Sequence, residues 1–372
     1  MQQEKILMVL KSFQFSSDNA SGAHPLVLQD LSTISHENQE AYGNDKLTAK
    51  VKDIFKEYFG SHSEVFFTFN GTASNVISLR SMCRSFETIY CSSCAHIYID
   101  EAGAAENFIG SKIIPIESDN GKILLEPIRT HVKENQGIVH RSQPKVISIT
   151  QASERGTLYS LDEIHEIISF AHKNGLLVHI DGARLANAAV ALNKSFKELT
   201  TDLGIDILSF GGTKNGLMFA EAIVVLNSSL LKDLPYIHKQ AMQLCSKNRF
   251  LSSQFLTYFT DELWKENAKN ANSMAQYFAK RLSDIPEVVI NSPVEVNMLF
   301  ASIPRAWIKP LQEYFSFYVW SQEESEIRLV TSFNTKKAQI DEFIAKMQWV
   351  KRNEPPKPIG RGDLESSDCK SH

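Results

Sequence analysis

Short apolar runs that stop at a polar residue or a glycine recur along the first two thirds of the chain. The run Leu176–Ile180 ends at Asp181, and the run Asp206–Phe210 ends at Gly211. Runs of this length that stop so abruptly are typical of buried strands followed by a sharp turn. Further strands are predicted by the apolar runs at 65–69, 146–149 and 222–226.

Segments with helical periodicity lie between these strands. The clearest is 161–173, which is amphipathic and is followed by Asn174-Gly175, a common helix stop. Two more helices are predicted at 47–59 and 76–82. Strands that alternate with helices indicate an α/β large domain with a mostly parallel central sheet, whose ligands bind at the carboxyl ends of the strands.

The pattern of apolar and polar residues changes near Asp261, where one long helix is predicted as far as Leu282. Short strand-like runs follow at 288–290, 298–300, 317–320 and 327–330, which together favour a smaller α+β C-terminal domain. We therefore expect four parts: an N-terminal segment at 1–14, a large domain at 15–260, a small domain at 261–350 and a tail at 351–372. The tail has three prolines and two glycines with little to bury, so we expect it to be disordered.

Composition excludes several classes of protein. The net charge of −4 and the lack of a Lys/Arg run argue against a nucleic-acid partner, and no apolar run approaches the ~18 residues of a membrane span. The five cysteines are odd in number and scattered, which favours a cytoplasmic location. Cys91 and Cys94 have the spacing of a redox or zinc motif, but a single pair is weak support. We expect small buried cysteines there, and no metal.

Candidate chemistry begins with Asp181 and Lys214, which follow two predicted strands and lie 33 residues apart. That spacing leaves room for one crossover helix, so both side chains are expected at the carboxyl edge of the sheet. Pyridoxal phosphate needs such a pair, since a lysine binds its carbonyl carbon and an acid keeps its pyridine nitrogen protonated. Gly211-Gly212 before the lysine would let the backbone approach the ring closely. The alternative is that Asp181 caps a helix and Lys214 is a solvated loop residue.

Three other places fit the same cofactor. Gly71 and Thr72 stand between a predicted strand and a predicted helix, where free N–H groups and the positive helix end bind phosphate. His96 is either a hydrogen-bonded core histidine or the group that covers the face of a bound ring. Arg328 interrupts an apolar run and must find an anion or reach solvent; the alternative is a surface ion pair with Glu326.

These residues belong to a set of motifs that spans the chain from about 15 to about 347. The motifs are Ser17-Asp18-Asn19, Tyr42-Gly43-Asn44-Asp45, Asn70 to Asn75, Ala95-His96 with Asp100 to Gly103, Ile149 to Ala152, Asp181 to Arg184, Phe210 to Gly216 and Arg328 to Thr331. In these motifs the chain resembles the low-specificity L-threonine aldolases, which are β-eliminating-lyase-like enzymes of fold type I (aspartate aminotransferase-like). The stretch 239–252 resembles the branch that contains phenylserine aldolases.

The resemblance implies a role for each matching residue. In the cofactor site, Lys214 would hold the cofactor covalently, Asp181 would pair with the pyridine nitrogen, Gly71 and Thr72 would bind the phosphate, and His96 would stack on the ring. In the substrate site, Ser17, Arg184 and Arg328 would hold the carboxylate, with Arg184 also near the cofactor. His140 would lie near the substrate hydroxyl. Lys239 and Arg249 would reach the cofactor phosphate of a neighbouring subunit, as the family forms dimers or tetramers.

The implied reaction is retro-aldol cleavage of L-threonine, L-allo-threonine and related β-hydroxy-α-amino acids to glycine and an aldehyde. The base that takes the hydroxyl proton stays open among His96, His140 and an ordered water. A preference for phenylserine, or another β-eliminating lyase or aminotransferase activity, is the alternative. A nicotinamide dehydrogenase would need a Gly-x-Gly-x-x-Gly turn, which the sequence lacks.

Overall fold

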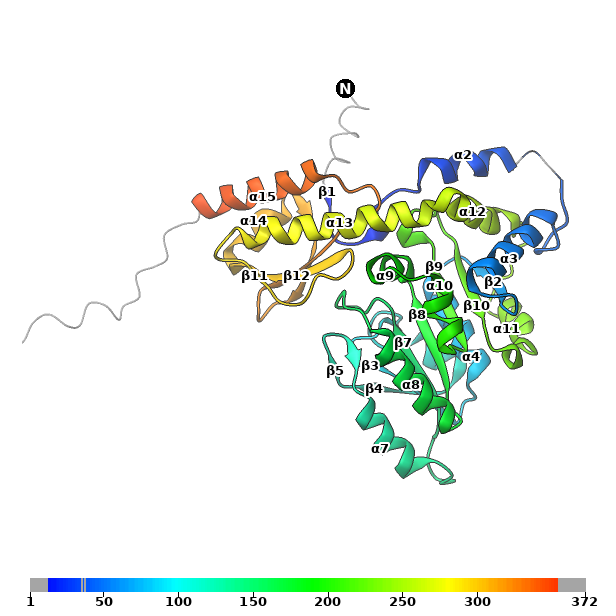
Figure 1. Cartoon of the computed structure of the whole chain (residues 1–372). Coiled ribbons are helices and arrows are strands. Elements are labelled where there is room, and N and C mark those ends of the chain that lie inside the picture. The colour runs from blue at the N-terminus through cyan, green and yellow to red at the C-terminus, as the bar shows by residue number, and fades with distance from the viewer. Residues whose placement is uncertain (1–12, 35, 37, 354–372) are drawn as a thin grey trace, which may run out of the picture.

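The computed structural model describes residues 13–34, 36 and 38–353 of the chain. Its centre is a seven-stranded sheet in the order β2-β10-β9-β8-β7-β3-β4 (Figure 1). The strands are β2 (Glu64–Thr68), β3 (Glu87–Ser92), β4 (Lys112–Ile116), β7 (Gln143–Thr150), β8 (Leu177–Gly182), β9 (Ile207–Gly211) and β10 (Glu221–Val225). Only β10 in this sheet runs antiparallel to its neighbours. The predicted mostly parallel sheet is therefore confirmed.

Apolar side chains cover both faces of this sheet, which explains why its strands are near-continuous apolar runs. Alternate residues of β10 point to opposite faces: Ile223 and Val225 enter one buried cluster, and Ala222 and Val224 enter another. Helix α4 (Gly71–Met82) packs on the first face. The second face is covered by α3 (Lys46–Phe59), α8 (Leu161–Lys173), α9 (Leu185–Leu192), α10 (Phe196–Leu199) and α12 (Arg249–Phe259).

Local signals fix the helix ends. Ser160 and Glu163 form a capping box at the start of α8, and the helix ends at Asn174, as predicted. Asp45 caps α3 by accepting from the N–H of Thr48 at 2.7 Å. The predicted helix at 261–282 begins later, at Leu263, because Asp261 and its neighbour have positive φ angles and break the helical path.

A second buried cluster forms the core of the C-terminal part. Its four-stranded antiparallel sheet has the order β11-β12-β15-β14, and three helices pack on it. The strands are β11 (Val289–Ile290), β12 (Met298–Ser302), β14 (Tyr318–Ser321) and β15 (Glu326–Val330); the helices are α13 (Leu263–Ser283), α14 (Arg305–Gln312) and α15 (Lys337–Arg352). Helix α13 crosses from one core to the other, with Trp264 in the first and Phe278 in the second (Figure 1).

The start of the described chain packs with this C-terminal part. Strand β1 (Phe13–Gln14) pairs in parallel with β13 (Phe315–Ser316), and the buried Phe15 ring lies 5.1 Å from that of Phe278. Phe15 was expected in the large domain; it belongs instead to the C-terminal core. The chain then passes directly to residues 16–20, so this pairing fixes the segment that enters the site below.

Several sequence predictions concern the edges of the chain or its surface. The predicted tail lies outside the described residues except for 351–353, where α15 continues to Arg352. Within the described ranges, no helix is both long enough and apolar enough to cross a membrane.

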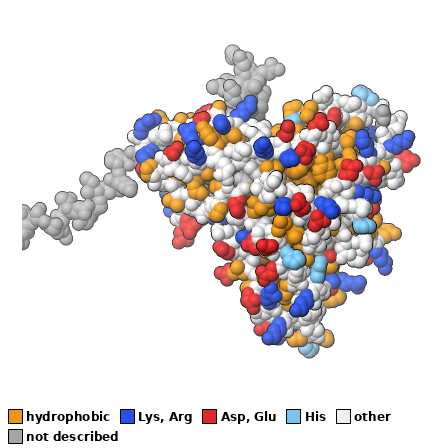
Figure 2. Space-filling view, viewed as in Figure 1, with side chains coloured by type: hydrophobic (Ala, Val, Ile, Leu, Met, Phe, Trp, Pro, Cys, Tyr) orange, Lys and Arg blue, Asp and Glu red, His pale blue; other side chains and the backbone are white. Residues whose placement is uncertain are grey.

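Acidic and basic side chains are interspersed over the face seen in Figure 2. Cys91 is buried on β3, and Cys94 lies in the turn that follows; both are free thiols.

Candidate active site

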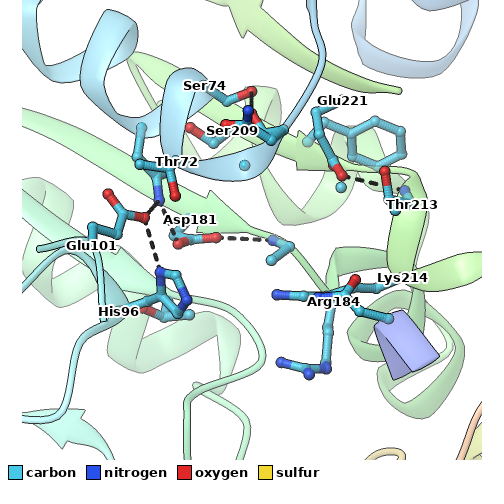
Figure 3. A pocket seen from close by; sticks show the side chains of 18 of the residues that line it. Thr72, Ser74, His96, Glu101, Asp181, Arg184, Ser209, Thr213, Lys214 and Glu221 are labelled. Atoms are coloured by element: carbon cyan, nitrogen blue, oxygen red, sulfur yellow. Dashed lines mark hydrogen bonds and ion pairs between the residues drawn. The ribbon is translucent and has the colours of Figure 1, made fainter. Parts of the chain in front are cut away.

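A cavity of about 350 Å³ opens at the carboxyl ends of the central strands. Its walls come from the ends of β7, β8 and β9 and from the first turn of α4 (Figure 3). Lys214, Asp181, Arg184 and His96 all line it. Residues that are up to 118 positions apart in the sequence thus meet at the sheet edge where the strand pattern predicts a ligand.

Lys214 lies in a short 3-10 turn, η3 (Thr213–Asn215), directly after β9. Its ammonium has no hydrogen-bond partner within 13–34, 36 and 38–353, so it is free to react. Burial and the nearby Arg184 charge lower the pKa of Lys214, which favours the neutral, nucleophilic amine.

The two glycines before Lys214 are required by close packing of the backbone. A Cβ at Gly211 would lie 2.4 Å from the carbonyl oxygen of Ala183, and a Cβ at Gly212 would lie 2.5 Å from that of Ala220. The backbone at Ala183 and at Ala220 cannot move aside without disturbing the end of β8 or the start of β10. The glycines therefore let two loops pack closely around the turn that carries Lys214; their role in a close approach of the backbone to a bound ring stays a prediction.

Asp181 ends β8 with its carboxylate fixed on both sides. Oδ2 accepts from Asn75 Nδ2 at 2.9 Å, and Oδ1 accepts from the N–H of Ala183 at 3.0 Å. Burial alone would raise the pKa of Asp181, but the Lys214 charge and the Asn75 hydrogen bond outweigh it and lower the pKa. The carboxylate is therefore anionic at neutral pH and suited to hold a protonated ring nitrogen.

A hydrogen-bond chain links Asp181 to His96 (Figure 3). Asn75 Nδ2 also donates to Glu101 Oε1, which is 2.9 Å from His96 Nδ1. The hydrogen bond to Glu101 raises the pKa of His96. Sequence reasoning assigned no role to Asn75 or Glu101, although both stand inside the motifs quoted above, and their shared contact appears only in the fold.

The first turn of α4 lines one end of the cavity. Asn70 caps the helix by accepting from the N–H of Ala73 at 2.9 Å. The N–H groups of Gly71 and Thr72 precede the first intrahelical bonds, and both residues line the cavity. A Cβ at Gly71 would meet nothing within 4 Å, so the space beside it is open to an anion.

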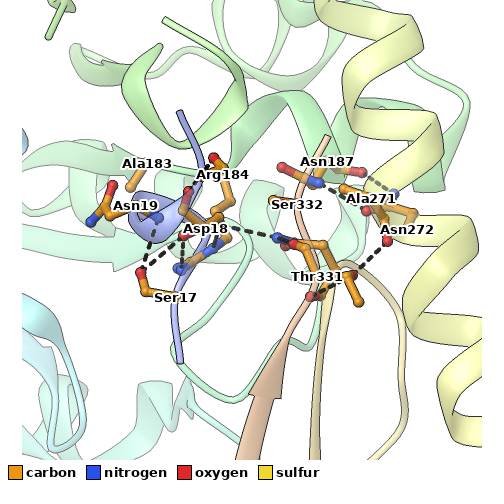
Figure 4. Close-up of polar contacts among 12 residues, drawn as sticks. Ser17, Asp18, Asn19, Ala183, Arg184, Asn187, Ala271, Asn272, Thr331 and Ser332 are labelled. Carbon is orange, nitrogen blue, oxygen red and sulfur yellow. Dashed lines mark hydrogen bonds and ion pairs between the residues drawn. The ribbon is translucent and has the colours of Figure 1, made fainter. Parts of the chain in front are cut away.

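Arg184 is held by a buried ion pair with Asp18 (Figure 4). Arg184 Nε donates to Asp18 Oδ2 at 2.7 Å, and Nη2 donates to Oδ1 at 2.9 Å. Asn297 from the C-terminal part donates to the same carboxylate at 3.0 Å. Asp18 takes two of the five donors of Arg184, and the side chain lines the cavity, so its geometry fits an anion such as a carboxylate. Asp18 stands in the motif Ser17-Asp18-Asn19, but its pairing with Arg184 appears only in the fold.

Arg328 reaches toward the same region from β15. Its Nη2 donates to the carbonyl of Ser16 at 3.1 Å, while the buried Nε has no hydrogen-bond partner in the described ranges. Burial and the nearby Arg184 charge lower the pKa of Arg328. The alternative pairing with Glu326 is wrong, because Glu326 forms a two-point ion pair with Arg155 at 2.9 Å. An unpartnered buried donor beside Arg184 fits a carboxylate-binding role.

Arg328 and four other predicted site residues do not line the cavity. Ser17 lies next to it and caps a 3-10 turn through its contact with the N–H of Asn19. His140 is exposed and lies three residues before β7 begins. The eight residues of β7 are separated by steps of ~3.3 Å, so the start of the strand lies roughly 23 Å from its end at the cavity. A role for His140 at this cavity has no structural support, because the strand carries it to the opposite sheet edge. Lys239 is exposed on α11 (Leu234–Gln240), and Arg249 begins α12.

The groups around the cavity fit pyridoxal phosphate. An unpartnered amine, an anionic carboxylate and a helix N-terminus with open space beside it match the carbonyl, the pyridine nitrogen and the phosphate of this cofactor. These are Lys214, Asp181 and the first turn of α4. The buried Nε of Arg328 and the free donors of Arg184 match a further carboxylate.

Comparison with known proteins places the chain among related enzymes. The family model described as beta-eliminating lyase matches residues 14–305. The low specificity L-threonine aldolase of Pseudomonas sp. (strain NCIMB 10558) is 39% identical over 92% of this chain and 99% of its own length. That of Pseudomonas aeruginosa is 38% identical over 91% and 97%, respectively. The solved structure of Leishmania major threonine aldolase is 27% identical, with a TM-score of 0.85 over 91% of this chain and 99% of its own.

Proposed function

Since the chain belongs to the beta-eliminating lyase family, we propose that it is a pyridoxal-phosphate-dependent aldolase. It cleaves L-threonine, L-allo-threonine and related β-hydroxy-α-amino acids to glycine and an aldehyde. The observation that carries this proposal is the meeting of Lys214, Asp181 and Arg184 around one cavity. The first two serve the cofactor, and the third, with Arg328, serves the α-carboxylate of an amino acid.

Each residue has a physical task in this reaction. When bound, pyridoxal phosphate supplies an electron sink for the bond that breaks at Cα. Asp181 keeps the ring nitrogen protonated, because its carboxylate stays ionised. Arg184 and Arg328 hold the substrate carboxylate, so that the Cα–Cβ bond stands perpendicular to the plane of the cofactor ring, where its electrons can enter the π system. Lys214 returns a proton to Cα after cleavage.

The test is product analysis with three substrates. The purified enzyme with pyridoxal phosphate is incubated with L-threonine, L-allo-threonine and L-phenylserine, and glycine and the aldehyde are quantified together. Equal molar amounts of glycine and aldehyde are expected, and a Lys214→Ala variant should form neither. Formation of a keto acid would instead indicate β-elimination, if ammonia is released with it, or transamination, if the amino group stays on the cofactor, and either would contradict the aldolase assignment.

We also propose that the enzyme is a homo-oligomer whose subunits share active sites. Arg184 and Lys214 are the only lysine or arginine residues among the described ones that line the cavity, so its phosphate end lacks a cation. Lys239 lies exposed, 5.1 Å from the ring of Tyr42. Exposed apolar side chains surround it, including Tyr236 at 77% and Met242 at 74%, which is typical of a surface covered by a partner. Lys239 and Arg249 then reach the cofactor phosphate of a second copy.

Complementation between two inactive variants tests this arrangement. Lys214→Ala lacks the reactive amine, and Lys239→Ala lacks the cation offered to the neighbour. Co-expression of both should restore activity in mixed oligomers, because one interface then combines an intact Lys214 with an intact Lys239. Light scattering of the wild type reports the subunit number. A monomer, or the absence of restored activity, would contradict the shared site.

The cytoplasmic location expected from the cysteines stays a proposal. Cys83, Cys91, Cys94 and Cys245 are free thiols in the described part of the chain, which fits a reducing compartment. Fractionation of cells that produce the protein would test it.

A further inference from the structure

Glu154 is a carboxyl group on the cavity wall to which the roles above give no task. It lies four residues after the end of β7, and its side chain is only partly exposed, toward the cavity. Oε1 accepts two hydrogen bonds, from the N–H of His96 at 2.9 Å and from the Thr150 hydroxyl at 2.8 Å. Oε2 has only a weak contact, with Cys94 Sγ at 3.9 Å. One oxygen is therefore fixed, and the other remains available to a ligand.

The fold places this carboxyl group on the same cavity wall as Asp181 and His96. Thr150 at the end of β7 is the register partner of Asp181 on β8, so the loop with Glu154 emerges beside the ring-nitrogen site. Its contact with the N–H of His96 puts Glu154 on the His96 side of the cavity. In Figure 3, Lys214 and Arg184 lie on the other side of Asp181 from His96. A substrate held by Arg184 would therefore extend its side chain toward the wall that carries Glu154.

The other carboxylates on the described cavity wall have each oxygen either hydrogen-bonded or buried. Asp181 is held on both oxygens, and Glu221 accepts from the N–H groups of Gly212 and Thr213 at 2.9 and 3.4 Å. Glu101 uses Oε1 for two contacts, and its Oε2 is buried away from solvent. Glu154 is thus the carboxyl group of the described cavity wall with an oxygen open to substrate.

His96 is a poor alternative for taking a proton. Its Nδ1 is committed to Glu101, and that hydrogen bond raises the pKa of His96. A histidine whose pKa is raised is more often protonated near pH 7 and cannot accept a second proton. His140, the other candidate, lies at the opposite sheet edge.

We propose that Glu154 is the general base that accepts the β-hydroxyl proton of the substrate. This inference rests on the proposed aldolase function. Glu154 takes the proton as the C–O bond becomes a carbonyl and Cα–Cβ breaks, so the aldehyde leaves neutral. The electron pair of the broken bond stays with the glycine fragment, and protonation of Cα by Lys214 completes glycine. No oxidant or further reactant is needed.

The protonation properties of Glu154 suit this task. Enclosure by protein raises the pKa of Glu154 to about 7, and the charge of Asp181 adds to the effect, while the bonds from His96 and Thr150 oppose it. A base with a pKa near the working pH is the most effective. The titratable groups that face Glu154 are His96 on α5 (His96–Ile99), Asp181 on β8, Cys91 on β3, and Cys94 and Tyr159 in loops.

The Glu154→Gln variant separates this role from a structural one. The amide keeps the acceptor for His96 and Thr150 but cannot take a proton. We expect kcat/KM for L-allo-threonine to fall by about 10²–10⁴-fold, while the cofactor spectrum and the exchange of the Cα hydrogen of glycine in D₂O stay as in the wild type. Glu126→Gln, on the exposed face of α7 (Leu125–Asn135), is the matched control and should behave as the wild type in every assay.

The outcomes distinguish this inference from the proposed function. If the wild type yields no glycine from any substrate, the aldolase function fails. If the wild type cleaves and Glu154→Gln cleaves equally well, or if the variant loses glycine exchange as strongly as cleavage, the general-base role is overturned.

A readout independent of turnover tests the protonation state itself. Infrared spectra of the holoenzyme should contain a protonated-carboxyl band that disappears as pH rises through about 7 and that is absent from Glu154→Gln. The pKa of Glu154 is higher in the folded protein than in the unfolded chain. The wild type should therefore lose thermal stability relative to Glu154→Gln as pH rises through the folded pKa. A band that titrates near pH 4, or two parallel stability curves, would remove the basis of the proposal.

Discussion

Asp18→Asn is predicted to destabilise the enzyme and to weaken substrate binding together. Asp18 is 1% exposed and the Arg184 side chain 12% exposed, and two short hydrogen bonds join them. The amide keeps the shape of the side chain but leaves the guanidinium without its counter-charge, next to Lys214. Breaking a buried ion pair by removing one partner costs about 3–5 kcal/mol of unfolding free energy.

That cost converts into a measurable change in melting temperature. An unfolding entropy of about 2.1 cal/mol/K per residue gives about 0.8 kcal/mol/K for a chain of 372 residues, so Tm should fall by about 4–6 °C. Asp53→Asn, an exposed position on α3, is the control and should change Tm little. The KM for L-allo-threonine should rise in the Asp18 variant, since Arg184 is no longer held in place.

The same pair predicts a dependence on pH. Burial alone would raise the pKa of Asp18, but the Arg184 and Lys214 charges outweigh it and lower the pKa. The pair therefore stabilises the fold above the unfolded pKa of about 3.9 and loses this contribution as pH falls through the lower, folded value. The difference in Tm between the wild type and Asp18→Asn should be largest at pH 7 and should become smaller in acid. Equal Tm values for the Asp18 and Asp53 variants at pH 7 would refute the reasoning.

Three further substitutions probe separate parts of the site. Asp181→Asn should retain cofactor but lose turnover by orders of magnitude, because the ring nitrogen is no longer kept protonated; steady-state kinetics beside a cofactor spectrum would check this, and near-normal turnover would remove the electronic role. Arg328→Lys should lose about 2–4 kcal/mol of transition-state stabilisation in kcat/KM, since a point charge replaces a two-point contact; unchanged kinetics would assign Arg328 to structure. Gly211→Ala should lower unfolding free energy by about 1–3 kcal/mol in a denaturant melt, because the new Cβ meets the Ala183 carbonyl at 2.4 Å; an unchanged midpoint would show that the loops can separate.

Local sequence patterns predicted the elements that carry the reactive residues. Apolar runs that stop at Asp181 and at Gly211 identified β8 and β9, and both runs are buried on two sides of a parallel sheet. The carboxyl ends of adjacent parallel strands meet at one edge, so the closeness of Asp181 and Lys214 followed from the fold class. The strand–turn–helix pattern predicted the helix start near Gly71, and the resemblance to L-threonine aldolases then supplied Arg184.

Contacts between distant residues could not be predicted in this way. Asp18 and Arg184 are 166 positions apart, and Arg155 and Glu326 are 171 apart. Periodicity reports which face of an element is buried, but not which side chain of another element lies opposite. The predicted alternative for Arg328 failed for this reason.

Matching of residue type alone misled the prediction for His140. A histidine near the expected part of the chain satisfied the resemblance, yet β7 separates it from the cavity by its full length. Glu154, at the other end of the same strand, had no motif to mark it. Its position on the cavity wall follows from the turn after Thr150, which only the folded chain shows.

Trapping the cofactor on the protein tests the assignment of the whole site most directly. The wild-type enzyme is loaded with pyridoxal phosphate, reduced with borohydride, digested and mapped by mass spectrometry. Reduction fixes the cofactor covalently to the lysine that holds it, and the added mass is predicted on the peptide with Lys214. Recovery of that mass on another lysine, with Lys214 unmodified, would contradict the site built around β8 and β9.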